Sequence, residues 1–158
     1  MSHNRPMSLS CIVYVSTASG PMGRSDLDEL LVRGRARNIL NNVSGVLLYD
    51  SGNFMHCIEG PNEGLHEVYG RITRSKLHHG VIQLLEEKIL VREFGAWSMA
   101  FRMRNTFGLS APAPMDALRQ KLEARLDDQP ENMSAARMIM KSFWKIMTDH
   151  GLANLADF

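Results

Sequence analysis

The sequence has few cysteines, no long apolar run and no apolar segment among its first residues. Its only cysteines, Cys11 and Cys57, lie inside apolar runs, where reduced packing residues are expected rather than a disulfide or metal pair. No stretch approaches the roughly 18 apolar residues of a membrane-spanning helix, and the N-terminal MSHNRPMSLS has no apolar segment of the kind that targets secretion. We therefore expect a cytoplasmic protein that does not enter the membrane.

The sequence also lacks an excess of charge and the motifs of common catalytic sites. Eighteen Lys and Arg against seventeen Asp and Glu leave a formal charge of +1, with no basic stripe, so direct nucleic-acid binding is not expected. The histidines form no CxxC or HxxxH pairing, which argues against a metal site. No Ser, Cys or acid pair stands beside a base at motif spacing, so we expect no catalytic residues and no enzyme activity.

What is present is a regular alternation of strand and helix patterns. Runs rich in β-branched and apolar residues predict strands, and Ser51-Gly52 between two of them predicts a β-hairpin. Apolar residues at i, i+3, i+4 and i+7 predict amphipathic helices. The expected strands are 8–17, 44–50, 53–59, 81–87 and 92–101, and the expected helices are 25–38 and 63–73.

This order, βαββαββ, predicts an α+β protein with a ferredoxin-like sheet and two helices on one face. We apply the crossover rule to the first and third strands, which predicts that they lie side by side and parallel at the sheet centre. Tyr14 and His56 would then be neighbours on the face that the helices cover. A buried phenol and a buried imidazole are costly without partners, so they must bond each other or a ligand.

After this domain, expected to span 8–104, the Pro-containing segment 105–114 is typical of a linker. Two further helical patterns occupy the extension 115–150, the second rich in Met. A sheet with helices on one face still exposes the other, and these two C-terminal helices are expected to cover it or to mediate association. The apolar surplus predicts a homo-oligomer or an unknown protein partner.

Several segments, in the same order, resemble the BLUF domain, a flavin-binding blue-light sensor family. They are IVYVS, ARNILNNVSGVLLY, GNFMHCIEGP, YGRIT, the HH of KLHHG, and FGAWSM. The resemblance implies FAD as cofactor, with FMN as the alternative, and its ring between the two helices. It implies a photoswitch of Tyr14, His56, Trp97 and Met99. The cofactor-binding residues that it implies are Asn38, Arg71, Ile72, Leu30 and His78.

The resemblance also marks a departure at the switch itself. The family has a glutamine where this chain has His56, and an imidazole carries its donor and acceptor on opposite ring nitrogens. Further family positions are changed to Arg37, Ser75 and Leu77. We therefore expect an altered or absent light response.

Two alternatives remain open from the residues. One is a light-insensitive or flavin-free interaction module with the same fold. The other, less favoured, is an acylphosphatase-like enzyme in which the loop SGPMGR cradles a phosphate beside Arg24. The Gly and Pro of that loop are equally explained by a turn, and a shared fold does not imply a shared function.

Overall fold

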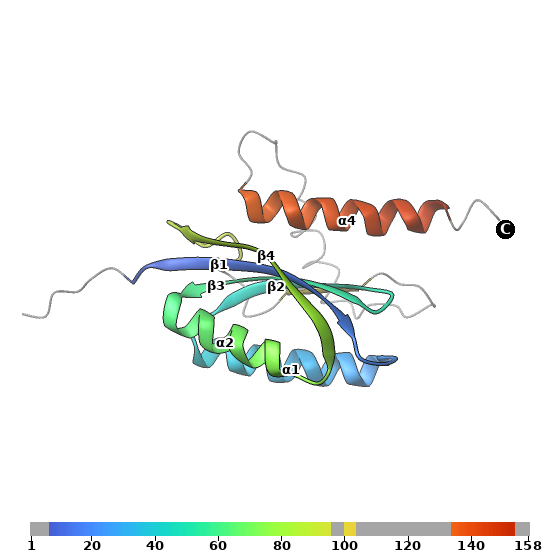
Figure 1. The fold of residues 1–158 in the computed structure, drawn as a ribbon, viewed down its shortest axis with the longest axis horizontal. Helices are drawn as coiled ribbons and strands as arrows, with labels where there is room; N and C mark the ends of the chain where they lie inside the picture. The colour runs from blue at the N-terminus through green and yellow to red at the C-terminus, as the bar shows by residue number, and fades with distance from the viewer. Residues whose placement is uncertain (1–6, 96–99, 104–133, 154–158) are drawn as a thin grey trace, which may run out of the picture.

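The computed structural model describes residues 7–95, 100–103 and 134–153. They form one β-sheet with helices packed on both of its faces. Figure 1 shows a helix pair below the sheet and a single helix above it. In the described part of the chain no helix is long and apolar enough to cross a membrane. The elements are β1 (Leu9–Ala18), α1 (Arg24–Leu40), β2 (Ser44–Asp50), β3 (Asn53–Pro61), α2 (Asn62–Arg74), β4 (His78–Ile89), β5 (Ala100–Met103) and α4 (Ala135–Ala153).

The sheet has five strands in the order β4-β1-β3-β2-β5, which confirms the α+β ferredoxin-like arrangement with α1 and α2 on one face. β1 and β3 are central neighbours, as expected, and Tyr14 lies directly opposite His56 in their register. The expectation that they run parallel was wrong, because β1 pairs with β3 antiparallel. The crossover rule applies to β1 and β2, which α1 connects. The hairpin after β2 then reverses the direction of the chain.

The β2–β3 hairpin occurs where the sequence predicts it. Ser51 and Gly52 both have positive φ angles, 48° and 85°, which is the backbone of a two-residue turn whose twist matches that of the strands. The fourth strand is longer than expected, spanning His78–Ile89 rather than 81–87. The predicted start of the last strand, residue 92, is wrong, because residues 92–95 are not strand. The last strand of the structure, β5, covers Ala100–Met103.

Residues 92–95 are held by side chains rather than by strand pairing. The carboxylate of Glu59, which is 1% exposed, accepts hydrogen bonds from the backbone N–H groups of Glu93 and Phe94, both at 3.0 Å. The Arg92 guanidinium donates to the backbone oxygens of Asn42 and Glu59. The bonds to Glu59 satisfy the backbone N–H groups of Glu93 and Phe94. These two groups therefore need no neighbouring strand as a hydrogen-bond partner.

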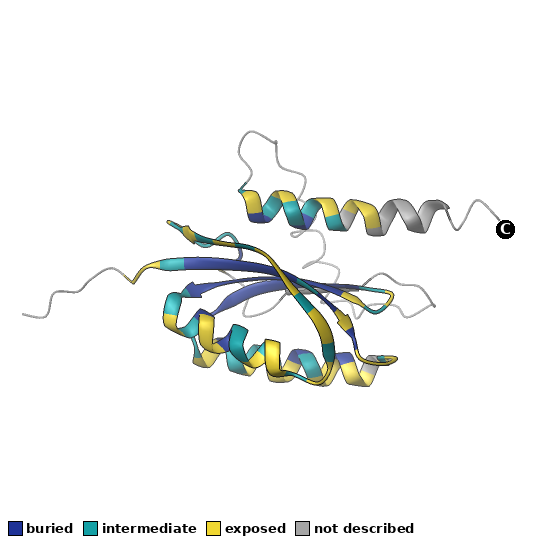
Figure 2. Cartoon of the chain, in the orientation of Figure 1, coloured by how far each residue is buried: buried dark blue, intermediate teal, exposed yellow. Residues whose placement is uncertain are grey.

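Alternating residues of the central strands supply the cores on both sides of the sheet. One face packs against α1 and α2, through apolar residues such as Leu27, Leu31, Leu65 and Val68. The other face packs against α4, where Ala136 and Met140 are almost fully buried. Figure 2 shows β1, β2 and β3 as the most buried layer, with exposed residues along β4 and along the outer sides of the helices.

The first residues of α4 are also tied to the sheet by charge. Arg137 of α4 forms an ion pair with Glu93, with Nε and Oε2 2.8 Å apart and both side chains largely buried. Because Glu59 holds the backbone of Glu93, α4 is connected through this residue to β3. The first of the two predicted C-terminal helices, the linker 105–114 and part of the extension 115–150 lie outside the described residues.

Candidate functional site

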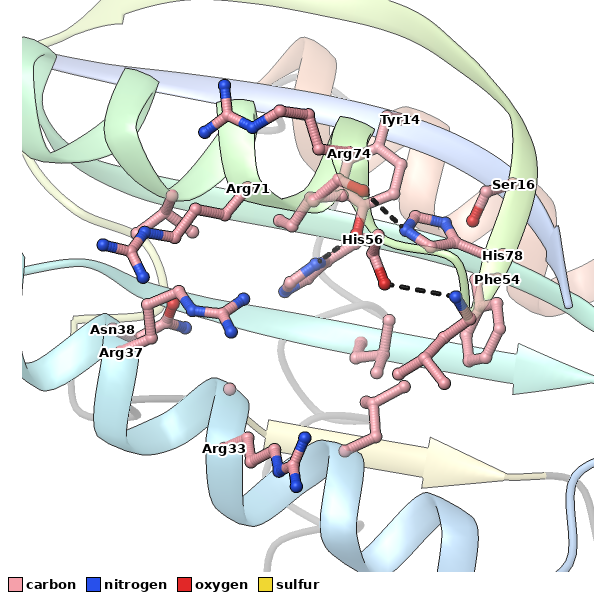
Figure 3. Close-up of a pocket in the computed structure, with 17 residues that line it drawn as sticks. Tyr14, Ser16, Arg33, Arg37, Asn38, Phe54, His56, Arg71, Arg74 and His78 are labelled. Carbon is pink, nitrogen blue, oxygen red and sulfur yellow. Dashed lines mark hydrogen bonds between the residues drawn. The ribbon is translucent and has the colours of Figure 1, made fainter. Parts of the chain in front are cut away.

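A cavity of about 350 Å³ lies between α1 and α2, on the face of the central strands that these helices cover (Figure 3). Ligand pockets in proteins are typically ~300–1,000 Å³ and combine apolar walls with a few polar groups. This cavity has that character, because aliphatic side chains from both helices face polar groups of the sheet. Its lining is Tyr14, Ser16, Leu30, Arg33, Gly34, Arg37, Asn38, Leu47, Phe54, His56, Val68, Arg71, Ile72, Arg74, Ser75, Leu77 and His78.

The structure brings the predicted site residues together around this one cavity. Every one of them that the structure describes is in the lining, although they come from five separate elements. Their role in binding a ligand stays a prediction. Trp97 and Met99, the other two predicted switch residues, lie outside the described residues. Those that line the cavity are Tyr14, Leu30, Asn38, His56, Arg71, Ile72 and His78.

Tyr14 and His56 form a buried hydrogen-bonded pair at the floor of the cavity. The phenol oxygen lies 2.8 Å from Nδ1 of the imidazole, and both residues are 4% exposed. Burial lowers the pKa of His56 to about 3, with a smaller contribution from His78. Burial also raises the pKa of Tyr14 well above its ordinary value. Both groups are therefore neutral near pH 7.

The bond between them decides where the imidazole proton lies. The distance alone fits either direction, and we assign the Tyr14 hydroxyl as the donor to Nδ1 because it has no other hydrogen-bond acceptor among the described residues. A neutral imidazole with Nδ1 as acceptor carries its proton on Nε2. The Nε2 atom is buried and has no hydrogen-bond partner within the described ranges. In Figure 3 it points into the space between the two helices.

An unsatisfied buried N–H is costly, about 1–3 kcal/mol, and such groups need an explanation. Here the explanation lies in the position of the atom, since a ligand in the cavity would meet it directly. The hydroxyl of Ser16 is a second buried polar group of this lining without a described partner. Together these atoms provide donors for a planar ligand with carbonyl oxygens, enclosed by Leu30, Val68 and Ile72.

His78 has a different environment from His56. Its Nε2 lies 2.8 Å from the backbone oxygen of Ile72, at the end of α2, and so donates to that carbonyl. Partial burial lowers the pKa of His78, although the bond to Ile72 opposes this. Its ring lies beside those of Tyr14 and Phe54, with ring centroids 6.3 Å apart in each case. His78 therefore acts mainly as a wall of the cavity and an anchor for α2.

Sequence reasoning missed several lining residues, above all the basic ones. Arg33, Arg37 and Arg74 join Arg71 in the lining, although only Arg71 was predicted as a binding residue. The helical spacing of Leu30, Arg33 and Arg37 could have indicated their shared face. Ser16, two residues after Tyr14 on β1, could have been found from strand alternation in the same way.

Comparison with known families supplies the identity of this arrangement. Residues 9–100 match the family model described as "BLUF: Sensors of blue-light using FAD". The chain belongs to the BLUF family. The cavity fits the flavin that this family binds, because its volume, its aliphatic walls and the unpaired Nε2 of His56 suit a flat ring with carbonyl edges.

BLUF proteins of different architectures are among the similar sequences and structures. The photoactivated adenylate cyclase subunit alpha of Euglena gracilis is 35% identical over 88 residues, covering 56% of this chain and 9% of that protein. The blue light- and temperature-regulated antirepressor BluF of Escherichia coli (strain K12) is 26% identical, covering 58% of this chain and 23% of that protein. The chain thus spans a small part of these relatives.

One solved BLUF structure matches nearly from end to end. The dark-state structure of BlrB, described as a BLUF protein, has a TM-score of 0.62 and 26% identity. The alignment covers 85% of this chain and 96% of that one.

The loop 19–23, considered above as a phosphate cradle, is not part of the cavity, so the acylphosphatase-like alternative gains no support.

Proposed function

We propose that this BLUF protein is an FAD-binding sensor whose light response differs from that of its family because His56 replaces the switch glutamine. The observation that carries the proposal is the buried Nε2 atom of His56, assigned above as an N–H donor, which faces the cavity without a described partner. A flavin carbonyl is an acceptor of the kind that this donor requires. FAD, rather than FMN, is proposed because the family description names it.

Each predicted residue has a role in this proposal. Asn38, which is 2% exposed, supplies a buried amide on the α1 side of the cavity, beside Arg37. Leu30 and Ile72 form aliphatic walls from the two helices, and Arg71 lies at the opening on the α2 side. When bound, the flavin supplies the light-absorbing group. The protein excludes water from it and holds Tyr14 and His56 in a fixed, neutral pair.

His56 also offers a proton path that an amide would not. Its Nδ1 can accept the Tyr14 proton while its Nε2 gives its own proton to a basic atom of a bound flavin, so the imidazole stays neutral, Tyr14 is left one proton short and the ligand would gain one. The imidazole then carries its proton on Nδ1, and Nε2 has changed from a donor into an acceptor. An amide head switches by rotation or tautomerisation instead, so the response to light should differ.

We further propose that the signal leaves through protein contacts rather than through catalysis. Support comes from α4, whose Ala136 and Met140 pack on the opposite face of β1 and β3 from the cavity. Met138 and Ile146 of α4 are more than half exposed and could meet a second copy or another protein. A cytoplasmic location is proposed because both cysteines are free and buried.

Absorption spectroscopy tests this function directly. The purified chain should be yellow with a flavin spectrum, and blue light should not produce the small reversible red shift of the family. His56→Gln should bind flavin and gain that shift. A colourless protein that cannot be reconstituted with FAD would refute flavin binding and favour the flavin-free interaction module. A normal red shift in the wild-type protein would refute the altered switch alone.

A further inference from the structure

The cavity-facing side of α1 has the polarity expected of an exposed surface. Leu30, Arg33, Gly34 and Arg37, spaced three or four residues apart, line the cavity from this helix. The opposite side carries apolar residues that face solvent, with Val32 66% and Ile39 67% exposed. Leu27 and Leu31, on a neighbouring side of the helix, pack on the sheet in the ordinary way. The cavity-facing side is therefore a separate basic strip, and its positive charge suits an anionic occupant of the cavity.

Arg37 and Arg74 are the two arginines of the lining that form no ion pair with a carboxylate among the described residues, and Arg37 is the more buried of the two. Arg33 pairs with Glu29, and Arg71 pairs with Glu67, each within its own helix. Arg37 is half-buried, and no described residue accepts a hydrogen bond from its guanidinium. A partly desolvated guanidinium without a carboxylate is unfavourable unless an anion binds it.

The neighbouring arginines add to the same positive field. The ion pairs of Arg33 and Arg71 are exposed, so their carboxylates are screened by water and neutralise the cavity only weakly. Figure 3 shows the Arg37 and Arg71 side chains at the same end of the cavity, on its α1 and α2 sides. The two helices thus place cations on both sides of one opening.

From this arrangement we infer that the opening is a phosphate site, and that Arg37 is its principal ligand. The protein then selects phosphorylated flavins, FMN and FAD, over riboflavin. This inference rests on the proposed flavin site and adds the residue of this chain that would select among flavins. Arg37 donates charge-assisted hydrogen bonds to the phosphate, and the positive charges of Arg33 and Arg71 attract the same phosphate. The ring occupies the enclosed part of the cavity, beside His56.

Binding of three flavins to the full chain, freed of cofactor, tests the inference. Dissociation constants for FAD, FMN and riboflavin are measured by flavin fluorescence at low and high salt. FMN and FAD should bind at least about tenfold more tightly than riboflavin, the difference expected of one charge-assisted contact. The difference should shrink as salt screens the phosphate.

Substitution on α1 then identifies the residue responsible. Arg37→Gln should weaken FMN and FAD about tenfold and leave riboflavin unchanged. The matched control is Arg35→Gln, which removes the same charge from the same helix at a position outside the cavity lining. It should change none of the three constants by more than about twofold, because a charge outside the cavity is screened.

The possible failures are distinguishable. Equal binding of all three flavins, or an Arg37→Gln effect as large on riboflavin as on FMN, would overturn the phosphate site while leaving the flavin site intact. The same loss in Arg35→Gln would show that only overall charge matters and would also overturn it. Absence of binding by any flavin would overturn the proposed function, and the phosphate site with it.

Discussion

The Tyr14–His56 hydrogen bond allows a quantitative prediction about stability. In Tyr14→Phe, Nδ1 of His56 keeps its buried position but loses its donor, so the free energy of unfolding should fall by about 1–3 kcal/mol. In His56→Leu, the Tyr14 hydroxyl is left without an acceptor, with a similar cost. The double variant leaves neither group unpaired, and it should cost less than the two single variants together.

The magnitude follows from the burial of both residues. Both are 4% exposed, and their heavy atoms are 2.8 Å apart, so water cannot replace the missing partner without entering the core. Directly contacting residues typically show coupling energies of about 0.5–3 kcal/mol, and we expect about 1–2 kcal/mol here. The estimate applies to flavin-free protein, because a bound ligand adds its own stabilisation.

Urea denaturation of the wild type, both single variants and the double variant gives the coupling energy. Tyr49→Phe is the matched control, since Tyr49 is 9% exposed and its hydroxyl makes no hydrogen bond to another described residue. This control should cost less than about 0.5 kcal/mol. Additive costs for Tyr14→Phe and His56→Leu would contradict the reasoning. So would a Tyr49→Phe cost equal to that of Tyr14→Phe.

Two further predictions concern buried ionisable groups. The pKa of His56 is lowered to about 3 in the folded state, below its ordinary value of 6.5, so the unfolded chain binds more protons between these limits. Its contribution to stability is complete above pH 6.5 and is lost on acidification, by up to ~1.4 kcal/mol per pH unit. His56→Gln should remove this part of the slope in denaturation at pH 4–7, and identical slopes would contradict the assignment. Glu59→Gln should cost about 1–3 kcal/mol in urea, because the amide nitrogen cannot accept the N–H of Glu93 or Phe94. Glu87→Gln on β4 is the control, and equal losses would refute the carboxylate clamp.

Much of the fold could be predicted because its signals are local. The Ser51-Gly52 turn, the alternation of β1 and β3, and the apolar spacing of α2 all report on backbone geometry over a few residues. The expected limits of the last strand failed for the opposite reason. Residues 92–95 have strand-like composition, but a carboxylate distant in the sequence, Glu59, holds their backbone instead.

The sequence predicted several of the residues that line the site, but not which contacts those residues make. Resemblance to the BLUF family named residues that the structure indeed gathers around one cavity, including Tyr14, Asn38 and His56. It gave no indication that Nε2 of His56 would be left without a partner. Nor did it show that Arg37 would line the cavity without a neutralising carboxylate, because that depends on how α1 is rotated against the sheet.

By itself, the sequence determined the order of the elements, the hairpin, the buried strands and the family, since each depends on neighbouring residues or on matched motifs. Only the tertiary structure decided the antiparallel pairing of β1 and β3, the hydrogen bond between Tyr14 and His56 and the position of Arg37 in the cavity lining. The physical reason is that polar groups in a core are satisfied or left unpaired by residues far away in the chain. The cost of an unpaired group is therefore a property of the assembled site.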